Sequence, residues 1–218
     1  MWVDRKIHQY HIWRCLIIVV LSDLVNELKI FVRKALGNSF EHGYPHIERV
    51  LNNAYEIVDH EELDIDRNIL TITVLLHDIG RLIGEPHAYY SSLFAKAYLS
   101  DRGVSSDVID CVVNAILYHS YSYVLEHNIK PICEISKILS DADKLDALGV
   151  VGFIRVFLYG ERVGRSLKET MDHFNNKILN LHKLMHYRYS REKALKLRER
   201  ILEMLRYLND ELILENKV

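Results

Sequence analysis

Residues 74–84, with the sequence VLLHDIGRLIG, join an apolar run to a histidine beside an aspartate. Apolar residues such as Leu76 and Ile79 bury a segment, which places His77 and Asp78 at the edge of a packed core. Polar groups are unfavourable there unless something compensates them. Two interpretations fit the pair. His77 caps a buried helix while Asp78 caps it or forms a salt bridge, or both bind a divalent cation, for which imidazole and carboxylate are suitable ligands.

The composition is typical of a soluble globular protein. Of the 218 residues, 49% are hydrophobic and 27% are charged, and the chain is long enough for one large domain or two small ones. Only three prolines and nine glycines imply few turns and long helices. The formal net charge of −2 argues against bulk binding to nucleic acid or to a membrane, so any recognition of phosphate must be local.

The cysteines Cys15, Cys111 and Cys133 are odd in number and lack the CxxC spacing. This pattern argues against a disulfide framework and a cysteine-type zinc site, and it favours a reducing cytoplasm. Residues 13–21 are largely apolar but too few to span a bilayer, and acidic residues soon follow them. We interpret them as a buried helix that follows a frayed extension, not as a signal peptide.

Apolar residues recur at helical spacing through most of the chain, which predicts an all-α fold. Residues 67–79 are ambiguous, because Ile72, Thr73 and Val74 would also suit a buried strand, but their helical surroundings favour a helix. No repeat or flexible linker is present, so the sequence predicts one helical domain over residues 1–218. The expected helices cover residues 16–36, 45–58, 67–79, 87–99, 106–117, 131–146, 166–189 and 190–212, with a loop at residues 120–128.

Two further segments carry charges that suggest a ligand. Residues 160–166, GERVGRS, combine two glycines with Arg162 and Arg165, which is typical of a loop that faces an anion. Asp141, Asp143 and Asp146 lie close together near the end of an expected helix. Because neighbouring carboxylates repel one another, we expect a cation or a base beside them.

Candidate metal ligands fall near the ends of the expected helices, where side chains from several helices can converge on one cavity. Twelve histidines also offer many accidental patterns, so this placement alone has little specificity. The candidates are His46, His77, Asp78, His87, His119 and Asp143.

Two other patterns are interpreted as surface features. His182 and His186 are four residues apart, but Lys183 stands where the zinc motif HExxH has its catalytic glutamate, so we expect a surface helix. Residues 188–206 are basic but interleaved with glutamates, which indicates a solvated or partner-facing helix and not a nucleic-acid stripe.

The ordered series His46, His77-Asp78 and Asp143 resembles the HD superfamily of metal-dependent phosphohydrolases, whose pattern is H…HD…D. The contexts that carry the resemblance are HIERV, LLHDIGR and ILSDADKLDALG, with HSYS at residues 119–122 and YGERVGRS at residues 159–166. It covers about residues 40–190 and is closest to single-domain bacterial and archaeal HD hydrolases that act on nucleotides. The resemblance implies an HD-domain helical bundle with additional N- and C-terminal helices.

The resemblance also implies roles for individual residues. His46, His77, Asp78 and Asp143 become the ligands of one divalent cation, for which manganese, cobalt, magnesium, nickel, iron and zinc are the candidates. Asp143 is chosen over Asp141 because the last aspartate of the family stands in an ADxL context, which Ala142–Leu145 fits. His87 and His119 occupy places where two-metal members carry further histidines. They could bind a second cation, or hydrogen-bond a phosphate and act as acid or base.

Such a site has a definite chemistry. Two histidines and two carboxylates fill about four positions of an octahedral cation and leave room for water and a phosphoryl oxygen. The metal lowers the pKa of the water and polarises the P–O bond. A basic residue beside it neutralises the equatorial oxygens, for which Arg81 is the best candidate. Lys144 and Asp146 could orient the water or Asp143. For each candidate arginine, the alternative interpretation is a solvated surface charge that does not contact a phosphate. The candidate substrate ligands are Arg49, Arg81, His87, His119, Lys144, Arg162 and Arg165.

The resemblance therefore implies a cytoplasmic phosphohydrolase that acts on a phosphate ester or anhydride of a small molecule, a nucleotide. A pyrophosphohydrolase acting on nucleoside triphosphates is favoured. The alternatives are a phosphodiesterase or 5'-nucleotidase on the same site, a catalytically silent regulatory domain that binds a nucleotide, and a structural helical protein. We expect no membrane partner, and the N-terminal helix could be a homodimer surface or a lid on the core.

Overall fold

The structure, a computed structural model, describes residues 21–215 and the side chains of residues 21–212. Within this range the chain forms helices and no strand, which confirms the predicted all-α class. The expected buried helix over residues 13–20 and the frayed extension before it lie outside the described residues, as does Cys15.

The helices follow one another with short connections. A first helix over residues 21–36 is followed by Gly37, whose φ of +63° is typical of a C-terminal glycine cap. The remaining elements are α2 (Tyr44–His60), α3 (Arg67–Leu76), the 3-10 helix η1 (Ile79–Leu82), α4 (His87–Asp101), α5 (Ser106–His119), α6 (Tyr121–His127), α7 (Glu134–Asp146), α8 (Gly149–Arg162), α9 (Leu167–Asn176), the 3-10 helix η2 (Ile178–Leu184) and α10 (Arg188–Glu215).

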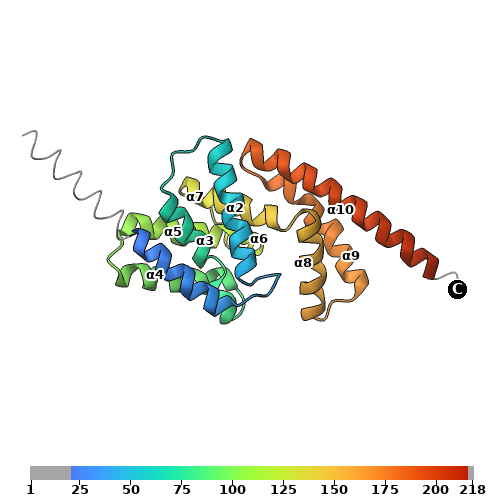
Figure 1. The fold of residues 1–218 in the computed structure, drawn as a ribbon, viewed down its shortest axis with the longest axis horizontal. Coiled ribbons are helices and arrows are strands. Elements are labelled where there is room, and N and C mark those ends of the chain that lie inside the picture. The colour runs from blue at the N-terminus through green and yellow to red at the C-terminus, as the bar shows by residue number, and fades with distance from the viewer. Residues whose placement is uncertain (1–20, 216–218) are drawn as a thin grey trace, which may run out of the picture.

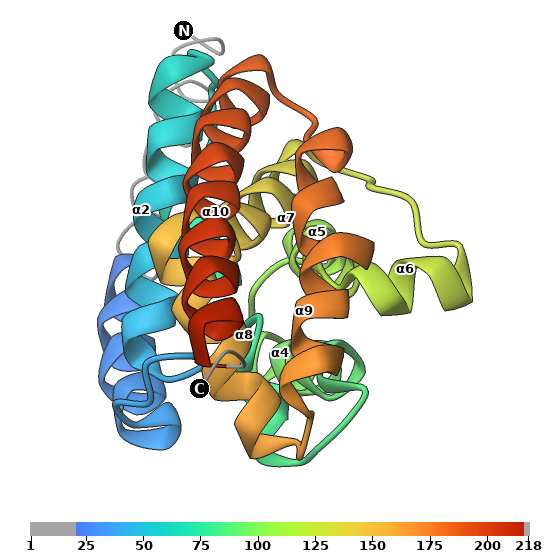
Figure 2. The same cartoon turned by 90° about the vertical axis from the view of Figure 1, so that its right-hand side faces the viewer.

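Helix α7 connects two groups of helices (Figure 1). On one side it packs against α2, α3 and α5, and α5 packs in turn against α4. On the other side it contacts α10, which lies along α8 and η2. Figure 1 shows α10 extending beyond the rest of the molecule, and Figure 2 shows α6 projecting from the body. A single apolar core runs through both groups of helices.

The ambiguous stretch before the HD dipeptide is a helix, as predicted. The side chain of Asp66 accepts hydrogen bonds from the backbone N–H groups of Asn68 and Ile69 and so caps α3. Thr71 and Thr73 donate their hydroxyls to the carbonyls four residues earlier, which satisfies them inside the core. Capping and helical burial therefore outweigh the β-preference of the branched residues.

The prediction of a loop at residues 120–128 is wrong, because residues 121–127 form the helix α6. This helix has no buried residue, so it lacks the apolar stripe by which the sequence predicts helices. It bends from α5 by 102°. Within the described residues, no single helix is long and apolar enough to cross a membrane, although this bent pair passes that test together.

Two helix boundaries also differ from expectation. Helix α7 begins at Glu134 and not at Pro131, because Cys133 before it is extended. The expected helix over residues 166–189 is divided into α9 and η2, since Lys177 takes φ −126° and ψ −63°. Reciprocal hydrogen bonds between Ser166 and Glu169 form a capping box at the start of α9.

A disulfide joins Cys111 and Cys133, which corrects the expectation that the cysteines form none. Cys111 lies on α5 and Cys133 caps the start of α7, and these helices pack against each other. The pair is 22 residues apart in sequence, so only the packing of the two helices reveals it.

Candidate metal centre

Five helices bring the six predicted ligands together. His46 lies in the first turn of α2, the pair His77 and Asp78 follows α3, and His119 is the last residue of α5. These four residues are buried, whereas the side chain of Asp143 on α7 is 27% exposed. His87 begins α4. The expected convergence of helix termini is therefore present, and its open side is at Asp143.

Gly80 allows the HD turn to lie directly against the start of α4. A Cβ on Gly80 would overlap the carbonyl oxygen of His87 and the backbone nitrogen of Ser91. The Gly80 N–H instead donates to the Ser91 hydroxyl at 2.8 Å. This close approach places His87 Nε2 3.4 Å from Oδ1 of Asp78.

Hydrogen bonds fix the orientation of the buried imidazoles. His77 and His119 donate Nδ1–H to the carbonyls three residues earlier, at 2.7 and 2.5 Å. His46 donates Nδ1–H to Oδ2 of Asp146 at 2.7 Å. Carbonyls and carboxylates only accept, so in each neutral ring Nδ1 carries the proton and Nε2 carries a lone pair. Such outer partners are typical of histidines that bind metals.

The lone pairs face one another without a donor between them. Nε2 of His46 lies 3.3 Å from Nε2 of His77, 3.5 Å from Oδ1 of Asp143 and 3.6 Å from Oδ2 of Asp78. Four acceptors at these distances repel one another unless a cation lies among them. The residues present therefore fit a divalent cation, which nitrogen and oxygen ligands of this kind bind.

Asp78 gives the clearest sign that the cluster lacks a partner. Its Oδ2 accepts a hydrogen bond from Arg81 Nε at 2.6 Å, whereas its Oδ1 is buried with no hydrogen-bond partner. Nε2 of His119 lies 3.8 Å from this Oδ1, on the same side as His87. His77, Asp78 and His119 form a second group that could hold a metal, beside the group of His46, His77 and Asp143.

The protonation states suit metal binding. Burial by itself would raise the pKa of Asp78, but Arg81 and the histidines outweigh it and hold the pKa well below its usual range. Burial lowers the pKa of His46, and it lowers that of His119 to about 3. The lowered pKa values keep Asp78 ionised and the imidazoles of His46 and His119 neutral, the forms in which these groups bind a cation.

A cavity of about 320 Å³ opens beside Asp143. Its volume is sufficient for a small-molecule ligand. Helices α5, α7 and the start of α4 line one part of it, and α8, α9 and η2 line the other. The lining is predominantly cationic, with the acids Glu85 and Asp143 and the basic residues Arg81, Lys144, Arg155, Arg165 and Lys177.

Comparisons with known proteins agree with this geometry. A model of the HD domain family matches residues 43–148. Residues 43–148 of this chain therefore form an HD domain. It is 26% identical over 193 residues to YpgQ, an uncharacterised protein of Bacillus subtilis (strain 168), which covers 85% of this chain and 92% of YpgQ.

Solved structures share the fold. YpgQ in complex with ADP has a TM-score of 0.69 at 25% identity and covers 88% of this chain and 96% of that chain. A predicted HD superfamily hydrolase from an uncultured Thermotogales bacterium has a TM-score of 0.59 at 26% identity, over 86% and 92%. An HD-superfamily hydrolase from Bacillus thuringiensis, at 24% identity, has a TM-score of 0.64 over 88% and 98%.

Asp146, three residues after the ligand Asp143, fixes the orientation of His46 by a hydrogen bond. Besides Nδ1 of His46, it binds Arg49 Nε at 2.6 Å and Arg155 Nη1 at 2.7 Å. Arg49 also donates to the carbonyl of Phe40 and does not line the cavity. Arg49 therefore lies behind the HD ligands, although the sequence suggested that it faces phosphate.

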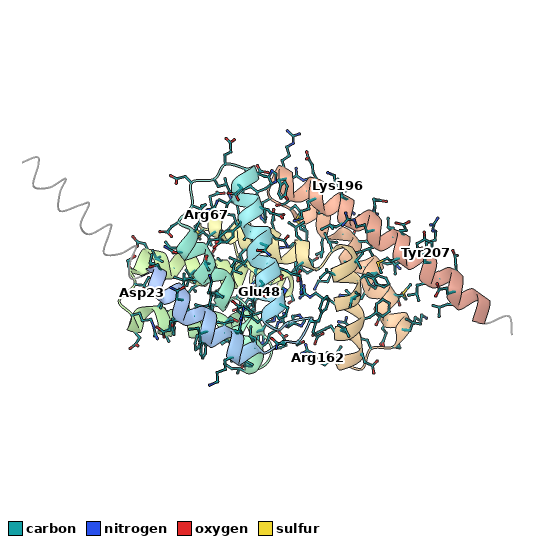
Figure 3. The ribbon with its side chains drawn as sticks, viewed as in Figure 1. Asp23, Glu48, Arg67, Arg162, Lys196 and Tyr207 are labelled. Carbon is teal, nitrogen blue, oxygen red and sulfur yellow. A yellow bond between two sulfur atoms is a disulfide. The ribbon has the colours of Figure 1, made fainter. Side chains whose placement is uncertain are left out.

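The other predicted substrate ligands differ in position. Arg81 and Lys144 line the cavity of the HD domain, and Lys144 Nζ donates to the carbonyl of Ser140 at 3.0 Å. Arg165 also lines the cavity, beyond the matched residues. Arg162 instead lies at the end of α8, where Nε pairs with Glu41 at 3.0 Å outside the cavity (Figure 3). Residues 160–162 belong to α8, so the expected anion-facing loop begins only at residue 163.

Four basic residues that line the cavity were not among the predicted ligands: His42, Arg155, His173 and Lys177. Arg155 is the single charge in the otherwise apolar residues 149–159, and His173 and Lys177 stand four residues apart, so both signals were present in the sequence. His42 precedes α2 and had no such signal.

His186 is not on a surface helix, which corrects the earlier interpretation. It follows η2 in a non-helical connection, and its Nδ1 donates to Asp141 Oδ1 at 2.7 Å. The expectation of a cation or a base beside Asp141, Asp143 and Asp146 is met. His186 lies beside Asp141, His46 beside Asp143, and Arg49 and Arg155 beside Asp146.

Proposed function

We propose that this protein is a metal-dependent phosphohydrolase that acts on a phosphate ester or anhydride of a small molecule, and that the substrate is a nucleotide. Hydrolysis of nucleoside triphosphates to a monophosphate and pyrophosphate is the favoured reaction. The observation that carries the proposal is the buried set of acceptors around His46 Nε2, which opens through Asp143 onto a cationic cavity. The complex of YpgQ with ADP supports a nucleotide as the ligand.

The chain would hold the cation with His46, His77, Asp78 and Asp143. A divalent cation bound there supplies a Lewis acid and lowers the pKa of water. Arg81, fixed by Asp78 at the edge of the cavity, places positive charge where the equatorial phosphoryl oxygens need it. Lys144, on the same wall as Asp143, adds a second charge.

His119 and His87 are placed to handle protons. Both Nε2 atoms lie on the Oδ1 side of Asp78, and both residues line the cavity. Nδ1 of His87 donates to Glu85 Oε2 at 2.9 Å, and its Nε2 lies 3.3 Å from Arg81 Nη2, the guanidinium at the edge of the cavity. With the proton on Nδ1, Nε2 of each neutral imidazole carries a lone pair that can accept a proton from water or from a phosphoryl hydroxyl.

The apolar side of the cavity suits the rest of a nucleotide. Val156, Ile178 and Leu181 line it together with the rings of Tyr121 and Tyr159. An apolar surface with aromatic rings can pack against a base, while the cations bind the phosphates.

The test is turnover of a nucleotide panel by the purified protein with manganese, cobalt or magnesium. We expect a nucleoside monophosphate and pyrophosphate from triphosphates, activity that EDTA abolishes, and loss of activity in Asp78→Asn. The matched control is Lys196→Ala, an exposed residue on α10, which should retain full activity (Figure 3). Full activity in Asp78→Asn would reject the proposal.

The identity of the products separates the alternatives. Orthophosphate released from monophosphates would indicate a nucleotidase, and cleavage of diesters a phosphodiesterase. Nucleotide binding without turnover under any metal would indicate a silent regulatory domain. Absence of metal in elemental analysis, together with absence of turnover, would indicate a structural protein.

A further inference from the structure

Three basic residues of the cavity lie on or beside α9, outside the matched HD domain. Arg165 precedes α9, His173 lies on α9, and Lys177 ends it. Their wall of the cavity contains no carboxylate of its own, because the acids that line the cavity are Glu85 and Asp143.

These residues differ from the other arginines of the cavity in having no ionic partner. Arg81 is bonded to Asp78, and Arg155 is bonded to Asp146. Among the described residues, by contrast, neither Arg165 nor Lys177 forms a salt bridge. The positive charges of this wall are therefore available to a ligand.

Arg165 presents an unsatisfied donor. Its Nη1 is buried and has no hydrogen-bond partner, although guanidinium N–H groups normally find one when buried. The guanidinium carbon lies 5.3 Å from the centre of the Tyr159 ring, which holds the side chain at the cavity.

His173 and Lys177 stand one turn apart and share the electrostatic field of Arg165. Burial, and then Arg165 and Lys177, lower the pKa of His173 to about 4. Burial also lowers the pKa of Lys177, and Arg165 and Arg81 lower it further, although Asp143 opposes them. The Lys177 ammonium lies 5.5 Å from the centre of the Tyr121 ring at the cavity. Mutual repulsion of this kind is relieved by a bound anion.

We propose that Arg165, His173 and Lys177 form a second anion subsite, which holds a phosphoryl group other than the one that faces His46, His77, Asp78 and Asp143. The assignment of this group to the substrate rests on the proposed function, whereas binding of an anion by the three side chains does not. A ligand with several linked phosphoryl groups would reach both ends of the cavity. A single phosphate would occupy only one.

The test is calorimetric titration of the metal-free, full-length protein with inorganic tripolyphosphate, in EDTA at constant ionic strength. We expect Lys177→Met and Arg165→Met each to weaken binding by about tenfold, because each removes a charge-assisted hydrogen bond. The matched control is Lys168→Met, an exposed lysine on the same helix that does not line the cavity. It should bind tripolyphosphate as the wild type does. Equal affinity in Lys177→Met, Arg165→Met and Lys168→Met would overturn the subsite.

A second measurement needs no variant and so does not depend on whether the variants fold. Lysines of the wild-type protein are acetylated with and without tripolyphosphate and quantified by mass spectrometry. The ligand should protect Lys177 and leave Lys168 equally reactive. Unchanged reactivity of Lys177 at saturating tripolyphosphate would overturn the subsite. The titration and the acetylation are done without metal and measure only the binding of an anion. Absence of nucleotide turnover in the separate activity assay would therefore reject the proposed function and leave the subsite standing.

Discussion

Asp141 and Asp143 lie two residues apart on α7, and each meets histidine, but only Asp141 has a complete set of donors. Asp141 accepts hydrogen bonds from the backbone N–H groups of His186 and Tyr187 at 3.0 and 3.1 Å, and from Nδ1 of His186 at 2.7 Å. Tyr118 completes the cluster, since its hydroxyl lies 2.9 Å from Nε2 of His186. The Asp141 cluster, defined by these four residues, docks the C-terminal segment onto α7.

The centre around Asp78 and Asp143 has similar residue types, but its acceptors outnumber the hydrogen-bond donors. Nε2 of His46 and Nε2 of His77 face each other, and Oδ1 of Asp78 has no donor. The difference shows that proximity of carboxylate and imidazole does not distinguish a structural cluster from a ligand site. The direction of the lone pairs does, because buried acceptors without donors are unfavourable until a cation or a proton satisfies them.

The largest effect is expected at the centre itself. Asp78→Asn removes the negative charge that faces four histidines and should weaken binding of the metal. Turnover should fall by at least about a thousandfold, since a bound metal stabilises the transition state by several kcal/mol. The midpoint of thermal unfolding without metal should fall little, because the substitution also removes a buried charge that lacks a full set of donors. Steady-state kinetics and calorimetry of the same sample check both. An Asp78→Asn protein that keeps its activity, or one that no longer folds, would contradict the distinction between a metal site at Asp78 and a structural cluster at Asp141.

The reverse result is expected for Asp141→Asn. This substitution breaks a buried pair with His186 and leaves backbone donors of the C-terminal segment poorly satisfied, so we expect about 3 kcal/mol less stability. Affinity for manganese should change by less than about twofold, since the HD ligands keep their contacts. Denaturant unfolding and calorimetric titration with manganese measure the two quantities. Loss of metal binding at unchanged stability would contradict the structural role.

Asp146→Asn tests the layer that supports the centre. The amide can still accept from His46 Nδ1, but it no longer carries the charge that Arg49 and Arg155 surround. Outer partners of metal-binding histidines contribute about tenfold to a hundredfold in affinity, so manganese should bind more weakly by that factor. Titration with manganese provides the measurement. A wild-type affinity would show that His46 needs no help from Asp146.

A smaller effect concerns pH and the far wall of the cavity. The folded pKa of His173 is lowered to about 4 from 6.5, so between these values the unfolded chain binds more protons and stability falls as pH falls. Solvent screening at this half-exposed side chain limits the loss to roughly 1 kcal/mol. His173→Gln should therefore lose less stability than the wild type between pH 6.5 and 4 in urea unfolding. Parallel curves for the two proteins would contradict the lowered pKa.

Much of the fold and the centre was accessible from the sequence. Apolar spacing predicted the all-α class. The H…HD…D series indicated which residues meet at the centre, where ligand atoms of His46, His77 and Asp143 lie within 4.8 Å of one another. Helix α6 escaped prediction because it buries no residue, and the break at Lys177 because no proline or glycine marks it.

Long-range pairs were the part that the sequence could not supply. The disulfide joins residues 22 apart, and Asp141 meets His186 from 45 residues away. Both depend on how helices pack, which local periodicity does not encode. Local periodicity also does not show that Arg49 pairs with Asp146 and Arg162 with Glu41, outside the cavity.

The central claim is that the unsatisfied acceptors around Asp78 bind a divalent cation and that the Asp141 cluster does not. The most direct test is anomalous X-ray scattering from crystals of the protein soaked in manganese. We predict one strong peak bounded by Nε2 of His46 and His77 and by the carboxylates of Asp78 and Asp143, and none beside Asp141. A peak beside Asp141 and His186, or no peak at the HD residues at saturating manganese, would contradict the account.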